Sequence, residues 1–143
     1  MAKYYNEIKE FFTRKPRFNV VLVKANSTES LKELSEKLRF QIVDLKKLTM
    51  EGGIELEKID GYTSLSESLK EIAKKIKGEG LLFLNLDLCL SVLSKKKREQ
   101  FFERILQKTF PNPVIFTTVL FKDEVPDVRY QEFNYAKIIE GEG

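Results

Sequence analysis

The stretch VVLVKANSTESLKEL, residues 20–34, decides the fold because two elements of different periodicity meet in it. Its first part, VVLVKA, is an almost unbroken apolar run, which is typical of a strand buried on both faces of a parallel sheet. Its second part places Leu31 and Leu34 at helical spacing, and Leu38 continues the same face. A buried strand that leads directly into a helix indicates the α/β class.

The rest of the chain alternates in the same way. Three further segments have apolar residues at helical spacing: residues 4–12, 64–78 and 95–110. Four further segments are short apolar runs that predict strands: residues 40–45, 80–88, 112–121 and 133–140. Residues 46–62 are the longest irregular segment, where we expect a mobile loop or a short helix. Gly78 is expected to end the helix that precedes it.

This alternation predicts a three-layer α/β sandwich, because right-handed crossovers place helices over both faces of a parallel sheet. The chain has 143 residues, of which 42% are hydrophobic, enough for one domain with a sizeable core. We therefore predict a single α/β domain over residues 1–143, with a mainly parallel five-stranded sheet.

Composition narrows the possible chemistry. The chain has one cysteine, Cys89, and no histidine, which excludes an intrachain disulfide, a Cys/His zinc site and catalysis by Ser-His-Asp or Cys-His groups. We therefore expect no metal and no cofactor, and favour a protein that is not an enzyme. The net charge of +3 permits contact with nucleic acid without predicting it. A Lys- and Glu-rich composition without His or Trp is typical of heat-adapted proteins.

The N-terminal segment does not have the pattern of a signal peptide. Glu7, Lys9 and Glu10 interrupt the apolar core that such a peptide needs. No segment of the chain approaches the roughly 20 consecutive apolar residues that span a bilayer. We expect a cytoplasmic protein that does not use a membrane as a partner.

Ligands of parallel α/β sheets usually bind beyond the carboxyl ends of the strands. Four predicted strand exits carry polar side chains: residues 24–28, 44–47, 85–87 and 117–118. The candidate ligand-binding residues at these exits are Lys24, Ser27, Thr28, Asn85, Asp87 and Thr117. Asp44 and Asp87 are the carboxylates that a metal-dependent enzyme would use there.

The first exit does not form an ordinary phosphate-binding loop. Such a loop needs glycines to wrap the anion, a Lys to reach the outer phosphates and a hydroxyl to hold magnesium. The exit KANSTES has no glycine, and aligning the hydroxyl with Ser30 puts Glu29 in the place of the Lys. This reversal of charge argues against ordinary ATP or GTP binding. The alternative is a simple helix start, with Asn26 and Glu29 as a capping box.

The third and fourth exits have two interpretations each. Asn85 and Asp87 could lie on one side of a strand, where a carboxylate can act on the water shell of magnesium, but without a phosphate cradle magnesium has little reason to bind. Thr117 and Thr118 could be polar sensor residues, or hydroxyls that satisfy the end of the sheet.

Five segments together resemble the core of a P-loop NTPase of the AAA+ type: NVVLVKA, STESLKEL, QIVDL, LLFLNLD and PVIFTTV. The resemblance covers about residues 18–121 and implies a five-stranded sheet with the second and fifth strands at opposite edges. It is a degenerate form, because the Walker A residues are absent. The segments LFLNLDLCLSVL and FNYAKI are also similar to small P-loop accessory proteins of BREX-type phage-defence systems.

A basic cluster and aromatic residues near the ends are the other candidate surfaces. The cluster consists of Lys95, Lys96, Lys97 and Arg98. Positive charge at a helix start is unfavourable, so the cluster is a candidate surface for nucleic-acid phosphate or an acidic partner. The alternative is a solvated helix start neutralised by Glu99 and Glu103. The aromatic residues, which could dock a partner or belong to the core, are Tyr4, Tyr5, Phe11, Phe12, Tyr130, Phe133 and Tyr135.

Three functions are compatible with these observations. The preferred hypothesis is a non-catalytic P-loop-like module in the assembly or regulation of a larger complex, nucleic-acid handling included, with a protein partner or a second copy of itself. The second is a residual nucleotide or phosphate binder that uses the helix start at Ser27 and Thr28. The third is a metal-dependent enzyme that uses carboxylates at the strand ends.

Overall fold

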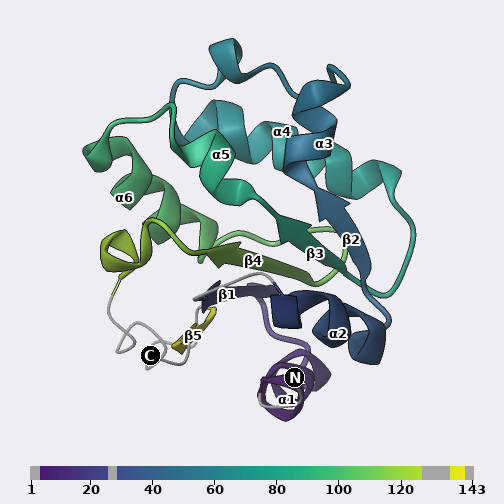
Figure 1. The fold of residues 1–143 in the computed structure, drawn as a ribbon. Helices are drawn as coiled ribbons and strands as arrows, with labels where there is room; N and C mark the ends of the chain where they lie inside the picture. Colours follow the sequence, from purple (N-terminus) through teal and green to yellow (C-terminus); the bar gives the residue numbers. More distant parts are fainter. Residues whose placement is uncertain (1–3, 26–28, 127–135, 141–143) are drawn as a thin grey trace.

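The computed structural model describes residues 4–25, 29–126 and 136–140, which form an α/β domain (Figure 1). The strands are β1 (Val20–Lys24), β2 (Gln41–Asp44), β3 (Leu81–Leu84), β4 (Val114–Thr118) and β5 (Lys137–Glu140). The α-helices are α1 (Tyr5–Thr13), α2 (Glu29–Leu38), α3 (Leu45–Met50), α4 (Tyr62–Lys75), α5 (Leu86–Leu90) and α6 (Lys95–Ile105). Two short 3-10 helices are η1 (Leu56–Lys58) and η2 (Lys122–Glu124).

The strands form one sheet in the order β2-β3-β4-β1-β5, and each neighbouring pair is parallel. The second and fifth strands therefore lie at opposite edges, which is the placement that the resemblance implies. β1 lies between β4 and β5, with Val21 level with Ile115 on one side and Lys137 on the other. All strands point the same way, so their carboxyl ends meet at one edge of the domain.

Helices cover both faces of the sheet, which confirms the predicted three-layer class. Val21 and Val23 face α1 and α2, where they pack with Ile8 and Leu34 in one core cluster. The alternate residues of the same strand belong to the other core cluster, which packs against α4, α5 and α6. Buried apolar runs thus become strands because both of their faces are covered.

Several predicted element ends are wrong, among them those of the third strand and of the helix before it. The strand predicted over residues 80–88 ends at Leu84, because Asn85 adopts a left-handed backbone (φ 65°) and α5 begins directly after it. Asn85 and Asp87 therefore do not alternate along one strand. Gly78 does not end the preceding helix: α4 stops at Lys75, and Ile76 is already extended (φ −106°, ψ 124°).

The irregular segment of residues 46–62 is partly helical, since it contains most of α3 and all of η1. β5 is shorter than the predicted last strand, and Tyr130, Phe133 and Tyr135 lie outside the described residues. Tyr4, Tyr5, Phe11 and Phe12 are half-buried and pack against the α1–α2 face of the core. In the described part of the chain, no helix combines the length and the apolar character that crossing a membrane requires.

Candidate functional site at the carboxyl ends of the strands

A cavity lies where β3 and β4 end, and it brings together residues from separate predicted exits. Its volume is about 440 Å³, and it is lined by Lys46, Asn85, Leu86, Asp87, Leu88, Ser91, Thr117, Val119 and Leu120. Three of the candidate ligand-binding residues, Asn85, Asp87 and Thr117, are among them. The cavity lies where ligands of parallel α/β sheets usually bind.

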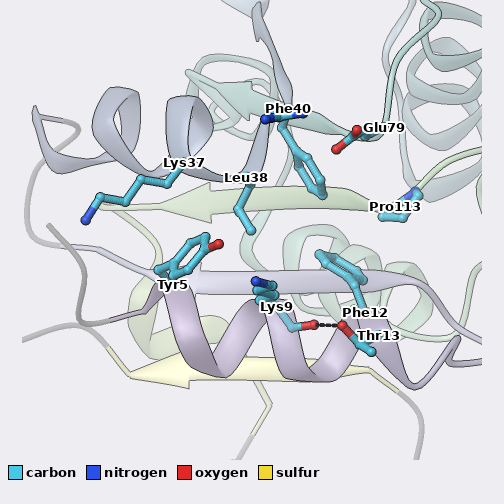
Figure 2. Close-up of a pocket in the computed structure, with 10 residues that line it drawn as sticks. Tyr5, Lys9, Phe12, Thr13, Lys37, Leu38, Phe40, Glu79 and Pro113 are labelled. Carbon is cyan, nitrogen blue, oxygen red and sulfur yellow. Dashed lines mark hydrogen bonds between the residues drawn. The ribbon is translucent and has the colours of Figure 1, made fainter.

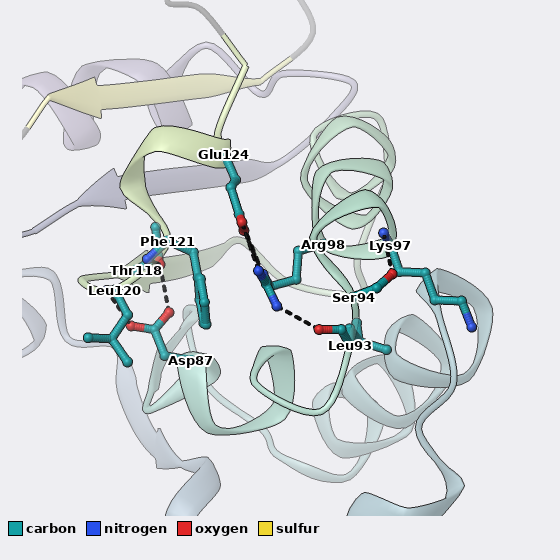
Figure 3. A network of polar contacts seen from close by, with 9 residues as sticks. All are labelled: Asp87, Leu93, Ser94, Lys97, Arg98, Thr118, Leu120, Phe121 and Glu124. Carbon is teal, nitrogen blue, oxygen red and sulfur yellow. Dashed lines mark hydrogen bonds and ion pairs between the residues drawn. The ribbon is translucent and has the colours of Figure 1, made fainter.

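The carboxylate of Asp87 holds the segment that follows β4 (Figure 3). Its Oδ1 accepts a hydrogen bond from the Thr118 hydroxyl at 2.6 Å. Its Oδ2 accepts from the backbone N–H groups of Val119 and Leu120, both at 2.9 Å. The Thr118 hydroxyl oxygen in turn accepts from the backbone N–H of Phe121 at 3.2 Å. Asp87 thus reaches across from α5 and caps the end of β4.

Asp44 and Asn85 connect the exits of β2 and β3. The side-chain amide of Asn85 donates to Asp44 Oδ1 at 2.7 Å. The same oxygen accepts from the backbone N–H groups of Lys46 at 3.0 Å and Lys47 at 3.5 Å, so Asp44 is the N-cap of α3. The carboxylates at both of these exits are therefore engaged in hydrogen bonds within the protein.

Lys24 pairs with the neighbouring edge strand. Its Nζ lies 3.0 Å from Glu140 Oε2 and 3.1 Å from Oε1, across the register position that the two residues share. Its side chain is only 20% exposed. Ser27 and Thr28, predicted to lie beyond Lys24, are outside the described residues. The structure thus keeps Lys24 away from the cavity of β3 and β4.

Comparison with known proteins gives no family. No family model, no curated protein and no solved structure matches this chain. Interpretation of the site therefore rests on its own residues and contacts.

The four residues of the basic cluster, residues 95–98, differ in their contacts and in their exposure to solvent. Ser94 caps α6 through a hydrogen bond from the Lys97 backbone N–H at 3.3 Å, and Lys97 Nζ donates to the carbonyl of Asp60 at 2.6 Å. Lys95 and Lys96 are exposed, whereas Arg98 turns inward. The cluster therefore does not present four equivalent cations to a polyanion.

Arg98 joins α6 to η2 (Figure 3). Its guanidinium donates to Glu124 in two-pronged fashion, from Nε at 2.5 Å to Oε1 and from Nη2 at 3.0 Å to Oε2. Its Nη1 donates to the carbonyl of Leu93 at 2.6 Å, and its guanidinium carbon lies 4.3 Å from the centre of the Phe121 ring. The hydrogen bonds to Glu124 raise the pKa of Arg98 above its ordinary value. Arg98 and Asp87 thus both hold the segment that follows β4, Arg98 through Phe121 and Glu124 and Asp87 through the backbone at residues 119–120.

The arrangement of the acidic side chains and the burial of Cys89 bear on metal binding and on nucleophilic chemistry. Within the described residues, no group of three or more His, Cys, Asp or Glu side chains lies in a position to hold a metal ion. Cys89 is fully buried, and burial raises the pKa of its thiol to about 11. The thiol of Cys89 therefore stays protonated at neutral pH.

Lys46, Ser91 and Leu120 line the cavity but are not among the candidate ligand-binding residues predicted from the sequence. Lys46 lies within the predicted exit of residues 44–47 but was not a candidate there, whereas Ser91 follows α5 and Leu120 lies two residues after β4, so both are outside the predicted exits. Helices begin directly after β2 and one residue after β3, and this arrangement places Lys46 and Ser91 beside the strand ends. Asn85 was the available indication, since Asn tolerates the left-handed backbone that ends a strand abruptly.

We expect Asp44→Asn to lower the free energy of unfolding by about 0.5 to 1 kcal/mol at pH 7. Burial opposes ionisation of Asp44, but hydrogen bonds from Asn85 and from the backbone of Lys46 and Lys47 outweigh it and lower its pKa below the ordinary 3.8. The ionised form is therefore favoured in the folded state. Its contribution is complete above the unfolded pKa and is lost as pH falls through the lower folded value.

Urea unfolding of both proteins between pH 3 and pH 7 measures this difference. The gap between wild type and Asp44→Asn should be constant from pH 5 to pH 7 and shrink below about pH 4. Asn can still accept the capping hydrogen bonds, so the comparison isolates the charge. A gap that stays constant down to pH 3 would show that the charge of Asp44 does not stabilise the fold.

Proposed function

We propose that this protein is a non-catalytic, P-loop-like α/β module that acts in the assembly or regulation of a larger complex, complexes that handle nucleic acid included. One observation carries the proposal. The Asp87 carboxylate, at the exit where an enzyme would direct it to a ligand, accepts hydrogen bonds from the backbone of Val119 and Leu120 instead. The order of strands in the sheet supports the P-loop-like part of the proposal.

The segment held by Asp87 presents an apolar side chain to solvent. Leu120 is 73% exposed at the rim of the cavity, which Leu88 also lines. Val92, two residues after the end of α5, is 46% exposed. Fully covering a leucine contributes about 1.5 to 3 kcal/mol, so a partner's apolar side chain entering the cavity beside Leu120 gains substantially. We infer that this rim is the assembly surface.

Recovery of the complex from the native source tests the proposal. Leu120→Glu should reduce the amount of co-purified partner at least about ten-fold, because the charge would have to be buried on binding. Met50→Glu is the matched control: Met50 is 79% exposed but does not line the cavity. Native mass spectrometry of the purified chain distinguishes a second copy from a different protein. Unchanged recovery of all partners with Leu120→Glu would contradict the proposal.

A second candidate function is binding of a nucleotide or phosphate in the same cavity. The observation that favours it is that Lys46, Asn85 and Thr117 all line this cavity at the carboxyl end of the sheet. Millimolar nucleotide or inorganic phosphate should then raise the melting temperature of the wild type, and Lys46→Ala should abolish the rise. Absence of any shift in the wild type would eliminate this candidate.

A further inference from the structure

A second pocket lies between α1 and α2, near the amino ends of β2, β3 and β4 (Figure 2). Its volume is about 500 Å³, and its lining residues are Tyr5, Lys9, Phe12, Thr13, Lys37, Leu38, Arg39, Phe40, Glu79 and Pro113. It is at the opposite end of the sheet from the cavity described above, since Phe40, Glu79 and Pro113 precede strands. We call it the α1–α2 pocket.

Three half-buried aromatic rings, which also pack against the core, line the α1–α2 pocket: Tyr5, Phe12 and Phe40. The rings of Phe12 and Phe40 are 5.7 Å apart between centres. Phe40 lies against the bare backbone of Gly80, where a Cβ would overlap its ring, so the ring is held in place. These rings offer flat apolar surface that remains accessible from solvent.

Positive charge borders the same rings. Lys9, Lys37 and Arg39 line the pocket together with one carboxylate, that of Glu79. Lys9 Nζ lies 5.5 Å from the centre of the Tyr5 ring. Figure 2 shows Lys37 at one end of the pocket and Glu79 with Pro113 at the other. An anionic chain would therefore follow the Lys9 and Lys37 side.

Arg39 occupies a backbone conformation that is unfavourable for its type. Its φ is 61°, in the left-handed region, directly after α2 ends at Leu38. Glycine is the usual residue at this position after a helix, because it has no Cβ. Strained residues of this kind cluster at functional sites, where the side chain is needed despite the strain. The side chain of Arg39 is exposed and lines the pocket.

We propose that the α1–α2 pocket binds single-stranded nucleic acid. Bases stack on the faces of Tyr5, Phe12 and Phe40, while Lys9, Lys37 and Arg39 contact the phosphates. This combination of aromatic faces with bordering cations is the means by which proteins bind single strands irrespective of sequence. An acidic peptide would use the cations but would leave the aromatic faces unoccupied. The nine residues of α1 extend over about 13 Å, which suits two to four nucleotides.

The proposal does not depend on the assembly surface at Leu120. The two sites lie at opposite ends of the strands, so Leu120→Glu should leave nucleic-acid binding unchanged. Failure of one proposal is therefore distinguishable from failure of the other.

Titration of fluorescent oligothymidylate and oligouridylate of 12 nucleotides with the full chain tests the proposal, and the two strands separate DNA from RNA. Arg39→Gly should weaken binding of the preferred strand about five-fold and lower the slope of log affinity against log salt by about 0.7. The same variant should raise the melting temperature, because glycine relieves the strained backbone. Weaker binding by a more stable protein cannot result from misfolding.

Lys15→Gly is the matched control. Lys15 is another exposed cation with a left-handed backbone (φ 52°), but it does not line the pocket. It should change affinity less than two-fold. Tyr5→Ala should weaken binding at least about five-fold through lost stacking, whereas Tyr5→Phe should restore it.

Three results would each overturn the proposal. The first is absence of binding to either strand at low salt. The second is an equal effect of Lys15→Gly and Arg39→Gly, which would indicate general charge attraction. The third is tighter binding of a polyglutamate peptide than of either oligonucleotide, which would assign the pocket to an acidic protein partner.

Discussion

Asp87→Ala is expected to lower the free energy of unfolding by about 3 kcal/mol and the melting temperature by about 10 °C. The substitution removes the acceptor of three hydrogen bonds, those from Thr118 and from the backbone of Val119 and Leu120. Thr118 is fully buried, so its hydroxyl loses its acceptor away from solvent. Urea unfolding and calorimetry measure the change.

Two further variants test the reason for this loss. Asp87→Asn keeps one oxygen for the backbone N–H groups and should cost about 1 kcal/mol. Thr118→Val removes only the hydroxyl, and a double-mutant cycle with Asp87→Ala should give a coupling energy of about 1 kcal/mol. If Asp87→Ala were more stable than the wild type, Asp87 would be a residue kept for function at the expense of stability, because replacing such a residue stabilises the fold.

Arg98→Ala is expected to lower the free energy of unfolding by about 2 to 3 kcal/mol. The Arg98 and Glu124 side chains are only 16% and 9% exposed, so removing the guanidinium leaves a nearly buried carboxylate without its partner. Contact with the Phe121 ring is lost as well. Equilibrium unfolding in urea, repeated at low and high salt, measures the effect.

The neighbouring lysines supply the control for Arg98. Lys95→Ala and Lys96→Ala should change stability by less than about 0.5 kcal/mol, because both side chains are exposed. Arg98→Lys should recover only part of the loss, since an ammonium group does not reproduce the two-pronged contact with Glu124. Equal, small effects at all of these positions would show that the pair with Glu124 contributes little.

The fold class was predictable because its determinants are local. Buried apolar runs such as VVLV and LLFL are covered on both faces in the structure, as their composition indicates. Helix spacing at Leu31 and Leu34 likewise predicted which side of α2 faces the sheet. Element ends were harder, because the left-handed backbone of Asn85 ends β3 within an apolar run.

The contacts of the candidate site were not predictable because they join distant residues. Asp87 meets Thr118, 31 positions away, and Arg98 meets Glu124, 26 positions away. Periodicity showed polar residues at the strand exits but not whether they face a ligand or one another. The α1–α2 pocket was hidden for the same reason, since Tyr5 and Phe12 belong to the N-terminal helix whereas Phe40 lies just before β2 and was not among the candidate aromatic residues.

The position of β1 in the sheet has a consequence for folding during synthesis. β1 is the first strand of this sheet to be made, but its partners are β4 and β5. Val20 can pair only once Val114 has been made, and Val21 can pair with β5 only once Lys137 has been made. Contacts between residues so far apart in the chain slow folding, because a long loop must close before they form. The strand VVLVK therefore leaves the ribosome with both edges unpaired, and we expect the sheet to become complete only after β5 has been released.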